Sequence, residues 1–179
     1  MIFCTIPVFS LFQLNINPII TYQKTAQLPI EIYVQPVTQF ITNNSSLLLP
    51  EWHIVPKTAV IILLYSFIPL ETSNRQVELE KQRLREEFLT LSKRIKITFQ
   101  KQGTLIAIID PQDGKPINSP ASQLSFDIIA VVHQLLNFSF YQIHGCKVLN
   151  HPIQQTAIYP SLLLSDADMT ITKSCLQHL

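Results

Sequence analysis

The sequence predicts an α+β fold, in which a mixed or antiparallel sheet packs against one long and one shorter helix. Three observations lead to this prediction. A strongly apolar run covers residues 59–70, a helical pattern begins at Arg75, and short strand-like segments follow a second helical pattern further along the chain. The order strand, long helix, strand, helix, strands is typical of α+β proteins.

The apolar run at residues 59–70 (AVIILLYSFIPL) is expected to form a buried strand that ends at Pro69. It is shorter than the ~20 residues that a membrane-spanning helix needs, and its β-branched and aromatic residues favour a strand. Seven of the 12 prolines lie before residue 70, so we expect extended segments and loops in the first third. Residues 1–30 show neither helical period nor much charge and are interpreted as an N-terminal extension.

The long helix is expected to begin near Arg75, where apolar residues start to recur at intervals of three, four or seven. Ser73 and Gln76 have the spacing of a capping box, and Gly103 suits the left-handed residue that closes a helix. The apolar stripe should place Phe88 against the sheet. Its members are Val77, Leu84, Phe88, Leu91, Ile95 and Phe99.

After the long helix, the sequence predicts a strand at residues 104–109 and a turn at residues 110–114 (DPQDG). Ser119 and Pro120 are placed as the N-cap and first residue of a second helix, whose apolar positions continue to Leu135. Three further strands are expected. They cover residues 138–141, 145–149 and 156–164. The domain is thus placed at residues 31–168, with residues 169–179 as a C-terminal tail.

The composition excludes several classes of protein. Hydrophobic residues make up 47% of the chain and charged residues 14%, so the chain is neither disordered nor polybasic. The formal net charge of +1 leaves no long-range field to attract a phosphate backbone or an anionic membrane. Neither a nucleic acid nor a membrane is therefore expected as a partner.

The positions of the glycines and cysteines exclude several nucleotide-binding and cysteine motifs. Gly103, Gly114 and Gly145 stand too far apart for a dinucleotide-binding or P-loop motif, both of which need closely spaced glycines. The three cysteines are odd in number and widely separated, so they provide neither a disulfide framework nor a Cys-x-x-Cys motif. A reducing compartment fits this cysteine usage, and a cytoplasmic location is expected.

One cluster of potential ligands stands out, formed by His144, Cys146 and His151. A thiolate and two imidazoles can bind a soft metal, and Lys147 beside the sulfur favours its ionised form. The three do not complete the four-ligand set of a structural zinc site. Alternatively, Cys146 is a small buried residue of a strand and the histidines occupy flanking turns.

Two other polar pairs have structural interpretations. Asp127 and His133 lie six residues apart on the expected second helix, nearly opposite each other, so they should not form an acid–base pair. Trp52 is interpreted as a hydrophobic anchor, and whether the neighbouring His53 reaches the Cys146 cluster is left open.

Several segments, taken in order and spacing, resemble the methylmalonic aciduria and homocystinuria type D proteins, which are cobalamin-trafficking adaptors. The resemblance extends from about residue 58 to residue 167. Animal members of the family are similar to this chain but carry Gly-Cys-Cys-Lys-Val, and their first cysteine is associated with a cobalt–sulfur bond. In this chain Gly145 takes that first position and Cys146 the second. The matching segments are residues 109–111 (IDP) with Gly114, Ser119-Pro120, residues 136–139 (LNFS), residues 145–148 (GCKV) and His151.

The resemblance implies a modified nitroreductase-like sandwich that binds no flavin and no other cofactor tightly. It implies a non-enzymatic adaptor that docks on a cobalamin-processing protein of type C and helps deliver cobalamin to cobalamin-dependent enzymes. Cobalamin would be met in the complex with that partner, and Cys146, His144 and His151 are the candidate binding residues. A flavin-dependent nitroreductase-like oxidoreductase is the alternative, and a structural partner that docks through its long helix is a third hypothesis.

Overall fold

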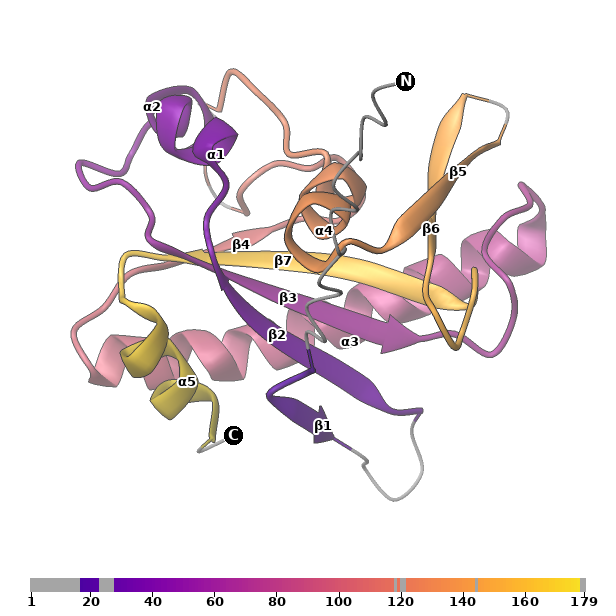
Figure 1. The fold of residues 1–179 in the computed structure, drawn as a ribbon, viewed down its shortest axis with the longest axis horizontal. Coiled ribbons are helices and arrows are strands. Elements are labelled where there is room, and N and C mark those ends of the chain that lie inside the picture. Colours follow the sequence, from indigo (N-terminus) through magenta and orange to yellow (C-terminus); the bar gives the residue numbers. More distant parts are fainter. Residues whose placement is uncertain (1–16, 23–27, 118, 120–121, 144, 178–179) are drawn as a thin grey trace, which may run out of the picture.

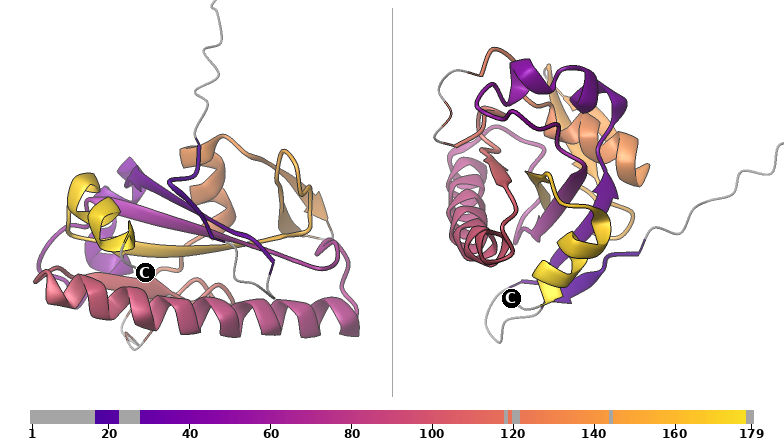
Figure 2. Two further views of the ribbon diagram at one scale, coloured as in Figure 1. Left: turned by 90° about the horizontal axis from the view of Figure 1, so that it is seen from below. Right: turned by 90° about the vertical axis from the view of Figure 1, so that its left-hand side faces the viewer.

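The computed structural model describes residues 17–22, 28–117, 119, 122–143 and 145–177. These residues form an α+β sandwich built on one antiparallel sheet, with helices on both faces (Figures 1 and 2). Each face of the sheet carries its own cluster of buried apolar side chains. The sheet is antiparallel throughout, which decides between the two sheet types that the sequence left open.

The central strands of the sheet are almost entirely apolar and buried. The strand β3 (Thr58–Tyr65) pairs with β2 (Ile30–Pro36) on one side and with β7 (Ile158–Ser165) on the other, as its apolar sequence predicts. It ends at Tyr65 rather than at Pro69, because the chain turns at Ser66, whose hydroxyl donates to the carbonyl of Ile68 at 2.7 Å. In spatial order the strands are β1 (Ile20–Tyr22), β2 (Ile30–Pro36), β3 (Thr58–Tyr65), β7 (Ile158–Ser165) and β4 (Ile106–Ile109).

The long helix α3 (Arg75–Lys101) covers one face of the sheet (Figure 2). The predicted orientation of Phe88 is confirmed, since its side chain is fully buried in the cluster between α3 and the sheet. The predicted cap at Ser73 is wrong by one residue: Asn74 accepts a hydrogen bond from the backbone N–H of Val77 at 3.0 Å. Gly103 follows the helix with φ of +69°, as expected for its closure.

Three short helices were not expected from the sequence. The segment interpreted as a C-terminal tail contains α5 (Met169–Gln177), which buries Cys175 and Leu176 in the same cluster as α3. The helices α1 (Gln39–Asn43) and α2 (Ser45–Leu48) lie in a stretch expected to be loop. They anchor it to the opposite face through one fully buried apolar side chain each, Ile41 and Leu48.

The helix α4 (Ile128–Leu136) lies on the face opposite α3 and is shorter than predicted. The predicted start at Ser119 is wrong, because the carboxylate of Asp127 caps the helix by accepting the N–H of Ala130 at 2.9 Å. Pro120 lies outside the described residues. The loop before the helix has a hydrogen bond of its own: the hydroxyl of Ser122 donates to the carbonyl of Leu124 at 2.6 Å.

A separate hairpin completes this face. It consists of β5 (Ser139–Ile143) and β6 (Cys146–Asn150), which pair only with each other (Figure 1). Both strands and β7 lie close to the predicted ranges. Among the described residues, no helix combines the length and apolar character needed to cross a membrane.

Candidate functional site

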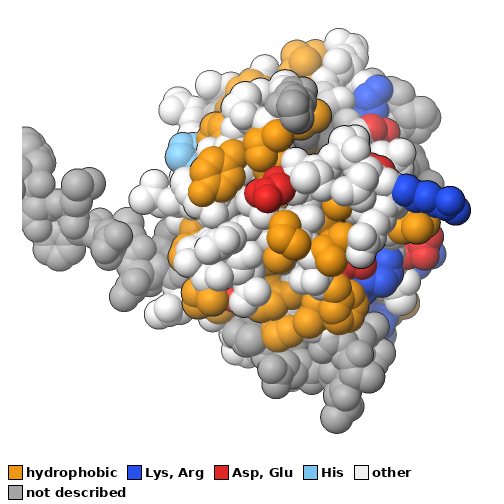
Figure 3. Space-filling model, turned by 90° about the vertical axis from the view of Figure 1, so that its right-hand side faces the viewer, with side chains coloured by type: hydrophobic (Ala, Val, Ile, Leu, Met, Phe, Trp, Pro, Cys, Tyr) orange, Lys and Arg blue, Asp and Glu red, His pale blue; other side chains and the backbone are white. Residues whose placement is uncertain are grey.

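A groove of about 680 Å³ runs between the hairpin, the first turns of α4 and α3, and the turn at residues 111–114. Its volume lies within the ~300–1,000 Å³ of typical ligand sites. Figure 3 looks onto the end of the molecule that carries the hairpin, where apolar side chains gather and the Lys and Arg side chains lie toward the α3 side. The groove is therefore the strongest candidate site in the described part of the chain.

The floor of the groove is apolar, and its rim is polar. Leu149 of the hairpin, Ile158 of β7 and Leu70 before α3 are buried and line the groove. The carboxylates of Glu71 and Asp113 lie on the rim. This combination favours a partner that presents both apolar and polar groups.

The turn at residues 111–114 is fixed to the rest of the groove by close backbone packing. The N–H of Phe126 donates to the carbonyl of Gly114 at 2.7 Å. A Cβ atom at Gly114 would lie 2.3 Å from the carbonyl oxygen of Phe126, and φ at this residue is +69°. Only glycine satisfies both conditions without strain.

An ion pair connects the same turn to the long helix. The guanidinium of Arg85 donates two hydrogen bonds to the carboxylate of Asp110, one of them at 2.7 Å. The hydrogen bond from Arg85 lowers the pKa of Asp110, and a backbone hydrogen bond from Gln112 adds to this. The rim is thus anchored to α3 as well as to the segment before α4.

Cys146 is exposed and lines the groove at the start of β6. The side chain of its neighbour Lys147 points to the opposite face of the strand. The ammonium of Lys147 instead binds the carboxylate of Asp127 and lies 5.5 Å from the centre of the Phe140 ring. Burial would raise the pKa of Asp127, but the hydrogen bonds from Lys147 and the Ala130 N–H outweigh it, so the pKa is lowered.

His151 lies in the turn after β6, where it is buried and does not line the groove that Cys146 borders. Its Nδ1 accepts the backbone N–H groups of Ile153 at 3.2 Å and Gln154 at 3.1 Å. This network assigns the proton to Nε2, which donates to Oε2 of Glu31 at 3.2 Å. Both ring nitrogens of His151 are therefore engaged in hydrogen bonds within the protein.

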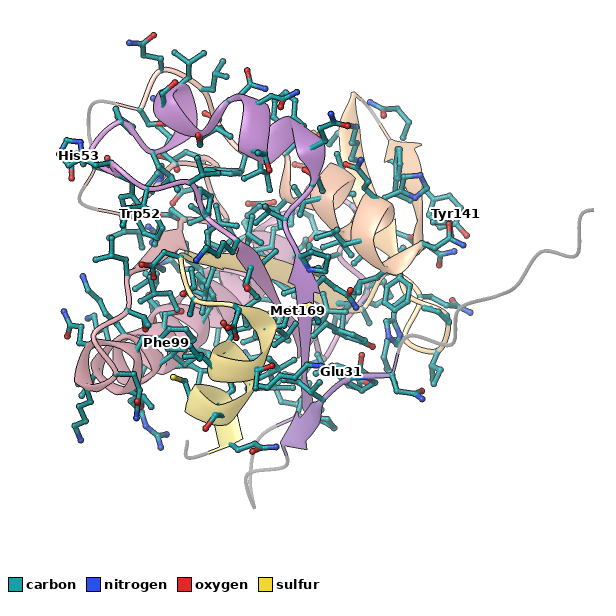
Figure 4. The ribbon with its side chains drawn as sticks, turned by 60° about the vertical axis from the view of Figure 1, so that its left-hand side comes forward. Glu31, Trp52, His53, Phe99, Tyr141 and Met169 are labelled. Carbon is teal, nitrogen blue, oxygen red and sulfur yellow. The ribbon has the colours of Figure 1, made fainter. Side chains whose placement is uncertain are left out.

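Of the other histidines considered as neighbours of Cys146, only His53 lies in the described part of the chain. His144 lies outside the described residues. Figure 4 shows His53 and Tyr141 of β5 on opposite sides of the molecule, so His53 does not reach the hairpin. Trp52 packs against the core, as expected of an anchor. No group of three His, Cys, Asp or Glu side chains in the described part of the chain is arranged to hold a metal ion.

Asp127 and His133 form no acid–base pair. Asp127 caps α4 and binds Lys147. Nδ1 of His133 lies 2.7 Å from the carbonyl oxygen of Phe138, and its ring packs edge-on against Phe140. Both residues therefore hold the hairpin against α4.

Sequence reasoning missed a buried carboxylate cluster around Glu31. The hydroxyl groups of Tyr33 and Tyr65 donate to this carboxylate at 2.7 and 2.6 Å, in addition to His151. Burial would raise the pKa of Glu31, but the three hydrogen bonds outweigh it and lower the pKa to about 2. Burial and the adjacent carboxylate raise the pKa of both tyrosines. The sequence carried one signal of this cluster: Glu31 is the single carboxylate of β2 and lies between Ile30 and Ile32.

Comparison with protein-family models finds no match to this chain, and comparison with curated proteins finds none either.

Proposed function

We propose that this protein is a non-enzymatic adaptor in cobalamin trafficking. It docks on a cobalamin-processing protein of type C and helps deliver cobalamin to cobalamin-dependent enzymes. The observation that carries the proposal is the position of Cys146: its thiol is exposed at the end of a hairpin and borders the groove of about 680 Å³. The resemblance of the sequence to the type D adaptors supplies the identity of the cargo.

Two of the segments that carry the resemblance line the groove, which supports the proposal. The turn at residues 111–114 and residues 145–148 line the same groove from opposite sides. Phe138 and His151, from two other matching segments, pack against each other with ring centres 5.0 Å apart. Residues that are distant in the sequence thus build and support one surface.

The chemistry available at this surface is ligand exchange at cobalt. A thiolate is a soft ligand and suits a soft metal centre. When the sulfur of Cys146 binds Co(III) of aquacobalamin, the bound water leaves, the thiol proton passes to solvent and the oxidation state of cobalt is unchanged. Cobalamin is cargo in this scheme, and the adaptor holds no cofactor of its own tightly.

The finer assignment of the fold belongs to the same proposal. We assign the sandwich to the modified nitroreductase-like type, with residues 31–168 as the adaptor domain and a cytoplasmic location. The flavin-dependent reductase is disfavoured by the charges of the groove. Its two described lysines, Lys81 and Lys147, are paired with Glu78 and Asp127, so neither is free to hold a flavin phosphate.

Co-elution tests the proposal. The protein is mixed with a purified type C cobalamin-processing protein loaded with cobalamin, and the mixture is passed through a gel-filtration column. We expect an earlier peak that contains both proteins and absorbs at the visible wavelengths of cobalamin, with the loaded processing protein alone as control. Separate elution would contradict docking, and a yellow sample after incubation with flavin mononucleotide would favour the reductase.

A further inference from the structure

The charges of α3 are distributed unevenly along its length. The first half of the helix, residues 75–87, carries four acidic and four basic side chains. Lys81 binds Glu78 there, and Arg83 binds both Glu80 and Glu87. The second half, residues 88–101, carries four basic side chains and no acidic one. The first half therefore balances its charges within the helix, whereas the second half does not.

Three of the four cations in the second half lie on the solvent-facing side of α3. Lys93 and Lys101 stand four residues before and after Ile97, and the third cation, Arg94, stands three residues before it. Side chains at these spacings share one face of a helix. All four are exposed, Ile97 to 54%, whereas Ile95 on the opposite side of α3 is fully buried. We call this surface of Lys93, Arg94, Ile97 and Lys101 the basic face, and Figure 2 shows α3 as the outermost layer on its side of the sheet.

No side-chain carboxylate of the described residues neutralises the basic face. All 12 acidic residues of the chain belong to the described part, and none of them forms an ion pair with Lys93, Arg94 or Lys101. The last acidic residue of α3 is Glu87, which lies six residues, or ~9 Å, before Lys93 and binds Arg83. The positive charges of the basic face are thus available to a partner.

Two ordinary roles explain only the other cations of this half. The helix dipole favours cations near a helix C-terminus, but its effect is confined to the last turn, where Lys101 lies. Lys96 stands on the flank of the helix and lines, together with Glu51, a cavity of about 280 Å³. Neither role applies to Lys93 and Arg94.

We propose that the basic face docks an acidic segment of a partner protein, in which carboxylates surround an apolar side chain. The carboxylates meet Lys93, Arg94 and Lys101, and the apolar side chain packs on Ile97. An apolar centre within a polar rim is the usual anatomy of a protein–protein interface, and arginine binds carboxylates with two parallel hydrogen bonds. The net charge of +1 argues against a phosphate backbone or an anionic membrane as the occupant.

The inference goes beyond the proposed function, because it concerns a different surface. The residues of α3 that line the groove reach only to Lys81, and the basic face begins at Lys93. Twelve residues of helix separate the two, which corresponds to ~18 Å. The protein thus has a second docking surface, apart from the groove that Cys146 borders.

A model peptide tests the charge and the apolar centre separately. The probe is a fluorescein-labelled peptide, Ala-Glu-Glu-Leu-Glu-Glu-Ala, whose binding to the full chain is followed by fluorescence anisotropy. One control peptide carries Lys in place of each Glu, and the other carries Ser in place of Leu. We expect the Lys control to bind at least about tenfold more weakly and the Ser control about fivefold more weakly. Equal binding of the Lys peptide would overturn the acidic segment, and equal binding of the Ser peptide would overturn the apolar centre.

Two matched variants of α3 locate the site. Arg94→Glu and Arg75→Glu each replace an exposed arginine and change the net charge equally, but Arg75 lies ~28 Å from Arg94 along the helix. We expect Arg94→Glu to bind the Glu peptide about tenfold more weakly and Arg75→Glu to bind it within about twofold of wild type. Equal losses would show that only the net charge matters. If Arg94→Glu does not fold, the double variant Lys93→Gln, Lys101→Gln decides, and it should weaken binding about tenfold.

Other anionic occupants are tested with vesicles that contain phosphatidylserine and with a DNA duplex. We expect the protein neither to sediment with the vesicles nor to shift the duplex at physiological salt, and either result would overturn a protein partner. These experiments contain neither cobalamin nor the processing protein. If the peptide binds as expected and co-elution with the loaded processing protein fails, only the proposed function is wrong. If co-elution succeeds and the peptide does not distinguish Arg94→Glu from Arg75→Glu, the basic face is not a docking surface.

Discussion

His151 donates its Nε2–H to Oε2 of Glu31 at 3.2 Å, across 120 residues of sequence. The contact joins the turn after β6 to the second strand of the sheet, and Phe138 packs against the imidazole. The hairpin that carries Cys146 is therefore held at its base by a buried polar cluster, while its tip borders the groove.

The first prediction concerns this cluster. Glu31→Gln replaces an oxygen that accepts hydrogen bonds with an NH₂ group that faces the donors of Tyr33, Tyr65 or His151. We expect the free energy of unfolding to fall by ~1–3 kcal/mol, since a buried donor loses its acceptor. Urea denaturation followed by circular dichroism measures it. An unchanged midpoint would show that the cluster does not stabilise the fold.

The second prediction is a pH dependence with a definite sign. The pKa of Glu31 is about 2 in the folded protein against an ordinary value of 4.5, so the unfolded state binds the proton more readily. The stabilisation is present above pH ~4.5 and is lost as the pH falls toward 2, and it amounts to about 3 kcal/mol. The difference in unfolding free energy between wild type and Glu31→Gln should shrink over this window. A constant difference would contradict the lowered pKa.

The third prediction concerns the turn that lines the groove. Gly114→Ala should destabilise the protein more than Gly103→Ala, although both residues have φ of +69°. An added Cβ meets nothing within 4 Å at Gly103 but lies 2.3 Å from the Phe126 carbonyl oxygen at Gly114. The shared backbone strain costs ~1–2 kcal/mol, and the clash should add ~1–3 kcal/mol. Equal losses in thermal denaturation would show that the turn moves freely.

The fourth prediction tests the packing of the long helix. Phe88→Ala should cost ~3–5 kcal/mol, because a fully buried ring leaves a cavity. Phe67→Ala is the control, since this ring is 65% exposed and contacts the guanidinium of Arg83 at its surface. A melting temperature of Phe88→Ala equal to that of the control would mean that this face of α3 is solvated, which would favour a partner helix.

The elements that the sequence predicted well have strong local patterns. The strand β3 is a continuous apolar run, and the stripe through Phe88 follows the helical period from Val77 to Phe99 of α3. The short helix α5 was missed because it has only nine residues and its burial depends on contact with α3. Local signals also placed the caps at Ser73 and Ser119, whereas Asn74 and Asp127 take these roles.

The candidate site was predicted only in part. Cys146 at the start of a strand beside a turn follows from local sequence, and the structure shows it exposed. The pairing of Lys147 with Asp127 and of His151 with Glu31 joins residues 20 and 120 positions apart, so no local pattern reports it. In these contacts Lys147 and His151 have carboxylate partners on other elements, while Cys146 borders the groove.

The most direct test of the central claim is the visible spectrum of cobalamin in the presence of the processing partner, compared between wild type and Cys146→Ser. Because Cys146 is exposed, the substitution should leave the melting temperature nearly unchanged. Cys175→Ala, which removes the buried thiol of α5, serves as the control. The account predicts a thiolate–cobalt spectrum for wild type and the control and its loss in Cys146→Ser. The wild-type spectrum in the folded Cys146→Ser variant would contradict the account.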